Sequence, residues 1–447
     1  MVNAPAKDRS RLLLAAATAG SIVESFDWLI YAVLAPYFAH AIFPGDDPVV
    51  SLLASYLVFA IGFLIRPIGA VIMGRIIDRQ GRKFGLVVSV SIISAGALVI
   101  ALTPSYDTIG VWAAVIVVFA RLFQGLSMSG EQAAVGTYLL ETAPRNRRFL
   151  FGAVASASSY VGQMLATACL AILLGIYGAE GLESGGWRVG FIVCAVMGLV
   201  ALWIRGAAPE SEIFTEQVKN ERPRQLPLLR ARTRQAAAIF LMLIPVTMGM
   251  YFITAYLAKF LSHAGVATKE QVTGYVPIFT VYLILVILVS GFLADRFGGL
   301  RILRIGYVTL AVCTLPVIIG LSTGLVPILP GALLYLTVLG AVTGPFAMVG
   351  PQLFPPAVRA VGVGLPSMIS VALFGGTFPL IAEGLTAADN SGAIPWYIGV
   401  GAILGLVGNI LVRKPDLIHD SDTTDQSREV RQHSARLRNT VISDRTR

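Results

Sequence analysis

Charged side chains are scarce in this chain of 447 residues: only 13% are Asp, Glu, Lys or Arg, whereas 56% are apolar and the mean hydropathy is +0.76. In ordinary globular proteins about a quarter of the residues are charged. The apolar residues also fall into blocks of roughly twenty, the helix length that crosses a hydrocarbon core of about 30 Å. The composition therefore excludes an ordinary soluble domain and predicts an all-α polytopic membrane protein.

Residues that bind metals or nucleotides are few as well. The three cysteines lie inside apolar runs without a paired spacing, and the four histidines have no metal-ligand spacing. No G-x-x-x-x-G-K run followed by Ser or Thr is present, so the chain lacks a P-loop for ATP. Ser156, Ser158 and Ser159 have no histidine nearby in the sequence. We therefore expect no metal, no cofactor and no enzymatic activity.

Hydropathy predicts twelve membrane spans. The first apolar run continues from Leu12 past Glu24 and Asp27 to about Phe38. This is longer than the core of a signal peptide, so we interpret the run as a transmembrane helix. The predicted spans are residues 12–40, 50–76, 84–103, 110–141, 149–176, 187–205, 235–262, 271–294, 302–321, 326–351, 361–386 and 394–412.

One long polar connection, which contains Pro209, Pro223 and Pro227, divides the spans into two groups of six. Repetition of this kind is typical of secondary transporters. The polar C-terminal tail has few aromatic residues and is expected to be disordered. The predicted parts are an N-terminal six-helix bundle (1–205), a cytoplasmic central loop (206–234), a C-terminal six-helix bundle (235–412) and the tail (413–447).

Cations cluster on one side of the predicted spans. Lys and Arg residues precede the first span and follow each even-numbered span, whereas the opposite connections are mainly acidic. Cytoplasmic loops of membrane proteins carry such an excess of Lys and Arg. Both termini are therefore predicted to be cytoplasmic, in the cell membrane of a bacterium. The net charge of +9 follows from this topology and does not indicate nucleic-acid binding.

A short polar stretch stands out within the hydrophobic part of the chain. It runs from Gly74 to Lys83 and reads G-R-I-I-D-R-Q-G-R-K. Its two glycines permit a sharp turn and a close approach of another backbone. A degenerate copy begins at Gly291, about half the chain later. We interpret the two loops as equivalent points of two related halves.

Ionisable residues inside the predicted spans are rare and costly to bury, so each is informative. Glu24 and Asp27 lie three positions apart in the first span and share a helix face. Arg66 precedes a proline in the second span. Arg121 lies near mid-depth of the fourth span, and Glu131 follows ten residues later. The ionisable residues are therefore concentrated in the first half of the chain.

Two interpretations of these charges stay open. In the structural interpretation, a carboxylate neutralises Arg121 or Arg66 as a buried ion pair. Arg66 then donates hydrogen bonds to carbonyl groups freed by the proline, and Glu131 forms hydrogen bonds within the first bundle. In the functional one, which we favour for Asp27 and Arg121, a carboxyl group in a cavity takes up a proton and an arginine holds an anion. The proton-coupling candidates are Asp27, Glu24 and Glu131, and the substrate-cavity candidates are Arg121, Arg66, Gln124, Tyr31, Tyr251 and Tyr256.

Several motifs resemble the major facilitator superfamily, and more narrowly its metabolite:proton symporter family. Residues 74–83 match the loop motif G-x-x-x-D-R-x-G-R-K in full, and residues 66–69 match R-P-x-G. Residues 24–28 resemble the family's E-W-(F/Y)-D pattern with Ser25 in place of tryptophan. Residues 121–131 resemble its R-x-x-Q-G…G-E run. The chain departs from the family at Gln352, where glutamate is frequent, and at Gly299-Leu300, where the second loop has an arginine pair.

The resemblance implies a monomeric transporter with two six-helix bundles that imports a small organic acid with protons by alternating access. A zwitterion such as betaine or proline is the alternative solute. A drug exporter is less favoured because the fifth span lacks the G-P dipeptide of such exporters, and a non-transporting sensor is the remaining alternative. The resemblance also implies that the first loop latches the two halves on the cytoplasmic side. The incomplete copy at Gly291 leads us to expect a weaker second latch. The expected gating residues are Gly74, Asp78, Arg79, Gly81, Arg82, Lys83, Asp295 and Arg296.

Overall fold

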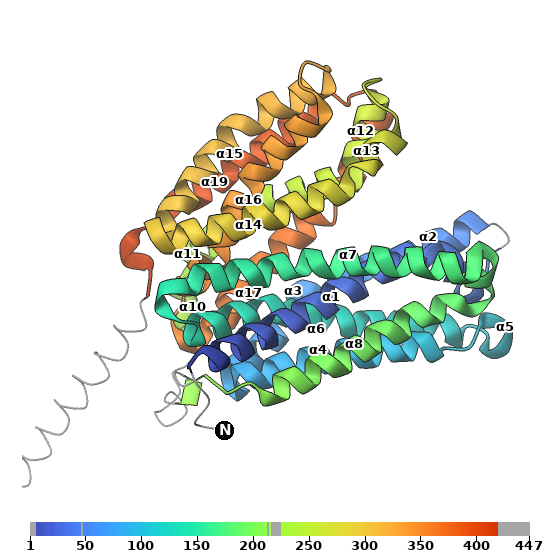
Figure 1. Ribbon diagram of the computed structural model, residues 1–447, viewed down its shortest axis with the longest axis horizontal. Helices are drawn as coiled ribbons and strands as arrows, with labels where there is room; N and C mark the ends of the chain where they lie inside the picture. The colour runs from blue at the N-terminus through green and yellow to red at the C-terminus, as the bar shows by residue number, and fades with distance from the viewer. Residues whose placement is uncertain (1–5, 46–47, 212–213, 216–224, 419–447) are drawn as a thin grey trace, which may run out of the picture.

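The structure, a computed structural model, describes residues 6–45, 48–211, 214–215 and 225–418. Within these ranges all regular elements are helices, and the long ones lie in two groups at an angle to each other (Figure 1). They form two bundles, coloured blue to green and yellow to red in Figure 1. The bundles meet near the N-terminus and diverge towards the other end of the molecule.

The first bundle is built around the long helix α1. This helix packs along α7 and α8, while α4 packs along α6 and α8. Aromatic rings fill part of the core between them, including Tyr31, Phe38 and Phe191. The helices of this bundle are α1 (Ala6–Ile42), α2 (Pro48–Leu64), α3 (Arg66–Gln80), α4 (Arg82–Leu102), α5 (Tyr106–Ile109), α6 (Trp112–Thr142), α7 (Arg148–Gly181) and α8 (Trp187–Ala207).

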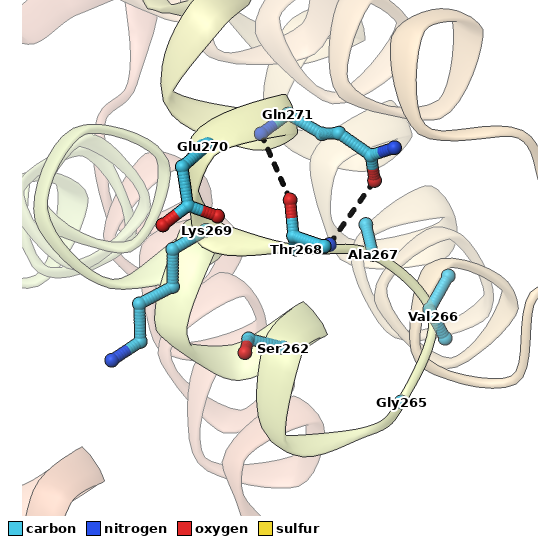
Figure 2. A pocket seen from close by; sticks show the side chains of 8 residues that line it. All are labelled: Ser262, Gly265, Val266, Ala267, Thr268, Lys269, Glu270 and Gln271. Atoms are coloured by element: carbon cyan, nitrogen blue, oxygen red, sulfur yellow. Dashed lines mark hydrogen bonds between the residues drawn. The ribbon is translucent and has the colours of Figure 1, made fainter.

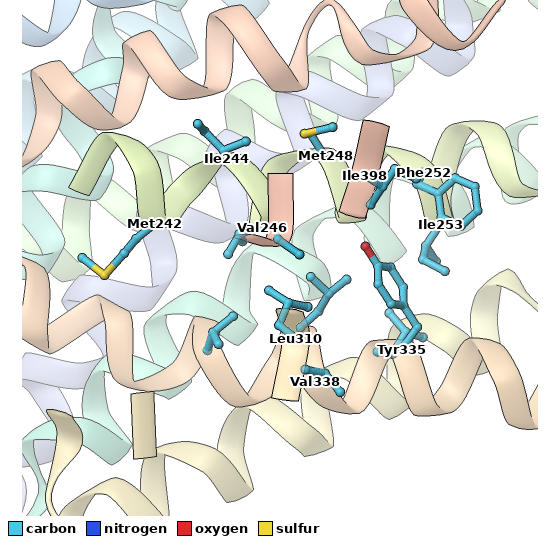
Figure 3. Close-up of a cluster of buried hydrophobic side chains, with 14 of the residues drawn as sticks. Met242, Ile244, Val246, Met248, Phe252, Ile253, Leu310, Tyr335, Val338 and Ile398 are labelled. Carbon is cyan, nitrogen blue, oxygen red and sulfur yellow. The ribbon is translucent and has the colours of Figure 1, made fainter. Parts of the chain in front are cut away.

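The second bundle has an apolar core in which Met242, Ile244 and Phe252 meet Leu310 and Tyr335 (Figure 3). Short π-helical turns interrupt its seventh and eleventh spans. The central connection contains α10 (Gln225–Arg230). The helices of the second bundle are α11 (Thr233–Tyr251), α12 (Leu257–His263), α13 (Lys269–Gly274), α14 (Val276–Phe297), α15 (Gly299–Ser322), α16 (Ile328–Gln352), α17 (Arg359–Ser370), α18 (Phe378–Ala387) and α19 (Ala393–Leu411).

The described residues contain the twelve spans that hydropathy predicts. Ten segments are long and apolar enough to cross a membrane, and α2 with α3 forms one more, bent by 44°. This bend precedes Pro67 in the first turn of α3, since proline cannot donate the hydrogen bond that would continue a helix. The 63-residue segment Arg145–Ala207 holds two spans. Its chain reverses between α7 and α8, at Gly178 (φ 67°) and Gly185 (φ 133°).

We retain the domain boundaries at residues 205 and 235 as a proposal; they fall in the last turn of α8 and the first turn of α11. Part of the central connection and residues 419–447 of the tail lie outside the described residues. The expected disorder of the tail therefore stays a prediction. The short tail segment that is described docks on the second bundle, where Asp416 accepts hydrogen bonds from Arg234 (2.5 Å) and Gln235 (3.1 Å).

Two aspartates join the bundles at the end that carries the basic loops. Asp78, near the end of α3, accepts hydrogen bonds from the main-chain N–H groups of Ala360 (3.1 Å) and Val361 (3.2 Å), in the first turn of α17. Asp295, near the end of α14, accepts hydrogen bonds from the N–H groups of residues 149 and 150, both at 2.9 Å, in the first turn of α7. Each carboxylate thus binds N–H groups that a helix leaves unsatisfied, where the helix dipole also favours an anion.

A cluster of buried charges supports the first of these contacts. The Arg82 guanidinium donates to Glu141 at 3.0 and 3.1 Å and to the carbonyl of Pro356 at 2.7 Å. Arg359 donates to the same Glu141 at 2.8 Å. The three charged side chains are fully shielded from solvent. Because Arg82 and Glu141 belong to the first bundle and Arg359 to the second, the cluster crosses the interface.

The second loop copy lacks the arginine that anchors this cluster. Gly299 stands at the position equivalent to Arg82, and the ring of Phe149 lies where its side chain would begin. The arginines that follow the two aspartates, Arg79 and Arg296, are both exposed. Lys83 donates to the carbonyl of residue 206 at 2.7 Å. The weaker second latch stays a prediction, for which the missing arginine is a physical reason.

The variant Asp78→Asn is expected to loosen the closed end, because it removes the negative charge from two hydrogen bonds to α17. Hydrogen bonds to charged groups contribute about 1.5–3 kcal/mol, and about 1.4 kcal/mol changes an equilibrium tenfold. A cysteine introduced at Ala347 on the inner wall, in a chain without its native cysteines, reports the opening. A membrane-impermeant thiol reagent applied from the basic side should modify it about tenfold faster in the variant.

Asp389→Asn is the matched control, because Asp389 is an exposed carboxylate at the other end of the molecule with a left-handed backbone (φ 55°) that asparagine tolerates. Its modification rate should equal that of the parent. Equal rates for Asp78→Asn and the parent would show that the contact to α17 does not hold this end closed.

Candidate functional site

A cavity of about 890 Å³ lies between the two bundles. Helices α1, α6 and α7 form its wall on one side and α11, α14, α16 and α17 on the other, with Phe59 and Arg66 added from α2 and α3. Sites for small molecules typically have volumes of roughly 300–1,000 Å³. The cavity is therefore large enough for a metabolite and is shared by both halves.

Three helices present a polar stripe to this cavity. On each of them the residues at positions i, i+3, i+4 and i+7 line the wall, which is the spacing of one helix face. Sequence reasoning did not identify the stripe of α7, although four polar residues at this spacing in an apolar helix are the signal that reveals it. The stripes are Ser21, Glu24, Ser25 and Trp28 on α1, Ser156, Ser159, Tyr160 and Gln163 on α7, and Thr247, Met250 and Tyr251 on α11, continued by Thr254 in the π-helical turn Phe252–Tyr256.

Arg66 is the one cation among the lining residues, all of which belong to the described part of the chain. Its guanidinium carbon lies 4.3 Å from the ring centroids of both Trp28 and Phe63, so two aromatic rings hold the planar group. Its Nε atom is buried without a hydrogen-bond partner, and its Nη2 atom contacts the Met128 sulfur at 3.9 Å. These contacts do not support the interpretation in which Arg66 bonds carbonyls beside the proline.

Glu24 is the one carboxyl group on the described wall. It lies on α1, is 8% exposed, and interacts electrostatically with Arg66. Tyr251 of the second bundle also lines the cavity and lies within electrostatic reach of Arg66. The wall thus brings together Glu24, Arg66 and Tyr251, three of the residues singled out from the sequence.

Asp27 and Arg121 form a buried ion pair behind this wall. Arg121 Nη1 donates to Asp27 Oδ2 at 2.9 Å, and Gln124 Nε2 donates to Asp27 Oδ1 at 2.9 Å. The Arg121 guanidinium also lies 3.9 Å from the ring centroid of Tyr31, and the Cys194 thiol lies 3.6 Å from Asp27 Oδ1. None of these five residues is among those that line the described cavity. The Nε and Nη2 atoms of Arg121 are buried without partners.

Two further candidates are bound within their own bundles. Glu131 forms a buried ion pair with Arg205 of α8, a partner that sequence reasoning missed because it lies far along the chain. The hydroxyl of Tyr256 donates to the carbonyl of Ala382 at 2.9 Å. Neither Glu131 nor Tyr256 lines the described cavity.

A second hollow, of about 520 Å³, lies between α12 and α13 at the end of the second bundle. Figure 2 shows that two of its polar residues bind each other: Gln271 N donates to Thr268 Oγ1 at 3.3 Å, and Thr268 N donates to Gln271 Oε1 at 3.1 Å. This arrangement is a capping box at the start of α13. The capping box accounts for the conformation of this loop without a ligand. The cavity between the bundles is therefore the candidate site.

The structure has a central cavity between two six-helix bundles, and Asp78 and Asp295 each join the bundles at one end. Comparison with known protein families agrees with this architecture. Residues 17–379 match the family model described as Major Facilitator Superfamily. The chain belongs to this superfamily. It is accordingly a multi-pass transporter of the cell membrane, and the predicted two-bundle fold is confirmed.

Curated relatives resemble the chain over most of its length. The alpha-ketoglutarate permease of Escherichia coli (strain K12) is 31% identical over 89% of this chain and 92% of its own. The citrate-proton symporter of Klebsiella pneumoniae is 31% identical over 87% of this chain and 89% of its own. The proline/betaine transporter of Escherichia coli (strain K12) is 28% identical over 90% of this chain and 83% of its own.

Among solved structures, the proton:xylose symporter XylE bound to 6-bromo-6-deoxy-D-glucose has a TM-score of 0.70 to this chain. The sequence identity is 17%, and the match covers 90% of this chain and 95% of the other. At this identity the likeness supports the fold alone. The choice of solute therefore has to be argued from the cavity.

The variant Arg121→Met is expected to destabilise the protein strongly, because it leaves the Asp27 carboxylate buried without its cation. Breaking a buried ion pair on one side costs about 3–5 kcal/mol, whereas replacing both partners with apolar residues is often nearly neutral. Thermal unfolding of the purified protein should therefore show a large fall in Tm for Arg121→Met and a smaller fall for the double variant Asp27→Leu, Arg121→Met. Arg145→Met, an exposed arginine, is the control. A double variant less stable than the single one would contradict the pairing.

Proposed function

We propose that the protein imports a small organic anion together with protons by alternating access. The observation that carries the proposal is Arg66, which two rings hold at the cavity wall and whose Nε donor has no partner. A guanidinium matches the geometry of a carboxylate, and their attraction is strong away from water. Two relatives whose names refer to carboxylates, alpha-ketoglutarate permease and the citrate-proton symporter, support this choice.

We assign the structure to a state that is closed on the cytoplasmic side. Asp78 and Asp295 join the bundles at the basic end, which the distribution of cations assigns to the cytoplasm. Gly74 permits this closure, since a Cβ atom there would lie 3.0 Å from the main chain of Val361. The solute then enters from outside, the bundles rock about the cavity, and the aspartate contacts break as the inner side opens.

We assign proton coupling to the carboxyl groups of α1. Protonation of Asp27 would remove the charge that holds Arg121, whose unpaired donors would then be free to turn towards a neighbouring acceptor. Glu24 lies one helical turn away and on the wall itself, so a proton there would leave Arg66 as an uncompensated cation for the solute. Glu131 is the weakest candidate because Arg205 already neutralises it inside the bundle.

A zwitterion is the second candidate solute. The wall holds one charge of each sign, Arg66 and Glu24, and a zwitterion presents one of each as well. The proline/betaine transporter among the relatives supports this alternative. The organic anion and the zwitterion can be distinguished in two ways. They differ in how a solute without an anionic group competes for uptake, and in whether Glu24 must be charged for binding.

Uptake into proteoliposomes is expected to depend on a proton gradient, acidic outside. Asp27→Asn should abolish this dependence, because an amide cannot take up the proton, and should leave exchange of solute between the two sides without a gradient. The measurement is uptake of labelled organic acids with and without the gradient, compared with solute exchange. If uptake by the parent protein does not depend on the gradient, the proposed coupling is wrong. If Asp27→Asn shows normal gradient-driven uptake, a residue other than Asp27 carries the proton.

Arg66→Gln is expected to weaken solute binding by at least about a hundredfold, because hydrogen bonds to a charged group contribute about 1.5–3 kcal/mol each and two are lost. Arg66→Lys should retain part of the affinity, since it keeps the charge but loses the paired geometry. Arg79→Gln, an exposed arginine of the loop, is the control for binding. Normal affinity of Arg66→Gln, measured by titration calorimetry, would contradict the role of Arg66. Normal uptake by Arg121→Leu would show that Arg121 holds no anion.

A further inference from the structure

The charges of the cavity limit the charge of the solute; this step rests on the proposed function. Arg66 and Glu24 are the charged residues of the described wall, one of each sign. A solute with two or three carboxylates would bring more negative charge than Arg66 neutralises, and its further carboxylates would meet Glu24. Unpaired charge in such a site is costly. The wall therefore favours a solute with a single carboxylate.

Methionine is concentrated on the same wall. Methionine side chains are flexible and polarisable, and their sulfur atoms make favourable contacts with aromatic rings. The methionines of such a wall adapt to a bulky apolar body, and their thioether sulfur atoms are only weak hydrogen-bond acceptors. Of the ten methionines in the chain, those that line the cavity come from five helices of both bundles: Met128 (α6), Met164 (α7), Met250 (α11), Met348 (α16) and Met368 (α17).

The aromatic residues near Arg66 leave little opportunity for a quaternary ammonium group. Such groups bind to the faces of aromatic rings. Here the Arg66 guanidinium lies 4.3 Å from the ring centroids of Trp28 and Phe63, and the ring of Phe59 lies 4.1 Å from that of Trp28. The protein's own cation and a neighbouring ring thus already occupy this cluster. A betaine that binds at this cluster would have to displace them.

We propose that the solute is an aromatic monocarboxylate. Its carboxylate binds the Arg66 guanidinium, whose Nε donor has no partner, and its ring lies against the methionines and Tyr160 of the wall. Ser159 and Gln163, on the stripe of α7, can bind a hydroxyl group on that ring. With Glu24 protonated, the complex of Arg66 and one carboxylate is electrically neutral, so the bundles can close around it without burying net charge.

The test uses pairs of solutes that differ in one property. 4-Hydroxybenzoate and terephthalate share a ring and differ by a second carboxylate in place of the hydroxyl group. 4-Hydroxybenzoate and 4-hydroxycyclohexanecarboxylate share their substituents and differ in the aromatic ring. Succinate and glycine betaine represent the dicarboxylates and the quaternary zwitterions. Affinities are measured on the purified full-length protein by titration calorimetry, and uptake is measured in proteoliposomes against protein-free liposomes.

We expect saturable uptake of 4-hydroxybenzoate and an affinity at least about tenfold higher than for each of the other four solutes. Tighter binding of terephthalate or succinate would overturn the single-carboxylate argument. Tighter binding of the saturated ring or of glycine betaine would overturn the aromatic argument. The absence of saturable 4-hydroxybenzoate uptake would overturn the inference as a whole.

Substitutions at Met250 test the wall itself. Met250→Leu keeps an apolar side chain of similar volume and should change the affinity for 4-hydroxybenzoate by less than about threefold. Met250→Gln places an amide of similar length against the ring and should lower it at least about tenfold. The Tm of the ligand-free variants shows whether both are folded. Equal affinities of the two folded variants would contradict contact between Met250 and the ring.

Failure of this inference and failure of the proposed function give different results. Gradient-driven uptake of succinate without any uptake of 4-hydroxybenzoate would overturn the aromatic solute and leave proton-coupled import of an anion in place. Saturable uptake of 4-hydroxybenzoate that does not depend on the proton gradient would support the solute class and overturn the proposed coupling to protons.

Discussion

The cost of burying an unpaired charge away from water governs the arrangement of this molecule. Asp27 binds Arg121, Glu131 binds Arg205, and Glu141 lies between two arginines, so these buried charges are neutralised inside the protein. Arg66 differs from these arginines, because aromatic rings hold it at the cavity wall and its Nε donor has no partner. The position where the protein leaves a charge incompletely satisfied is the position where a solute can satisfy it.

The same constraint operates at the closed end, where helix N-termini replace arginines as the partners of carboxylates. Asp78 and Asp295 occupy equivalent points of the two halves and each binds the first turn of a helix in the opposite half. The symmetry is incomplete, since Arg82 has no counterpart at Gly299. The two halves thus share a contact and differ in the charges that reinforce it.

The fold was largely predictable from the sequence, because hydropathy, cation placement and the loop motif all depend on local residues. The site was predictable in part. The spacing of Glu24 and Asp27 indicated a shared face, but only the packing of α1 against its neighbours separates them, with Glu24 on the wall and Asp27 behind it. Glu131 could not be matched with Arg205, because no sequence signal links residues on α6 and α8. The polar stripe of α7 was readable from its spacing, whereas the contact of Arg66 with Trp28 of α1 depends on the packing of distant helices.

The aspartates of the closed end bind main-chain atoms, and this affects how the chain can diverge. A bond to a peptide N–H makes no demand on the side chain of the residue that donates it, so the residues at 149, 150, 360 and 361 can vary as their own packing allows. Proline alone would delete the donor. Lineages of this protein can therefore reshape the surface around the inner mouth of the cavity, and with it the exit route of the solute, while the closing contact itself is inherited intact.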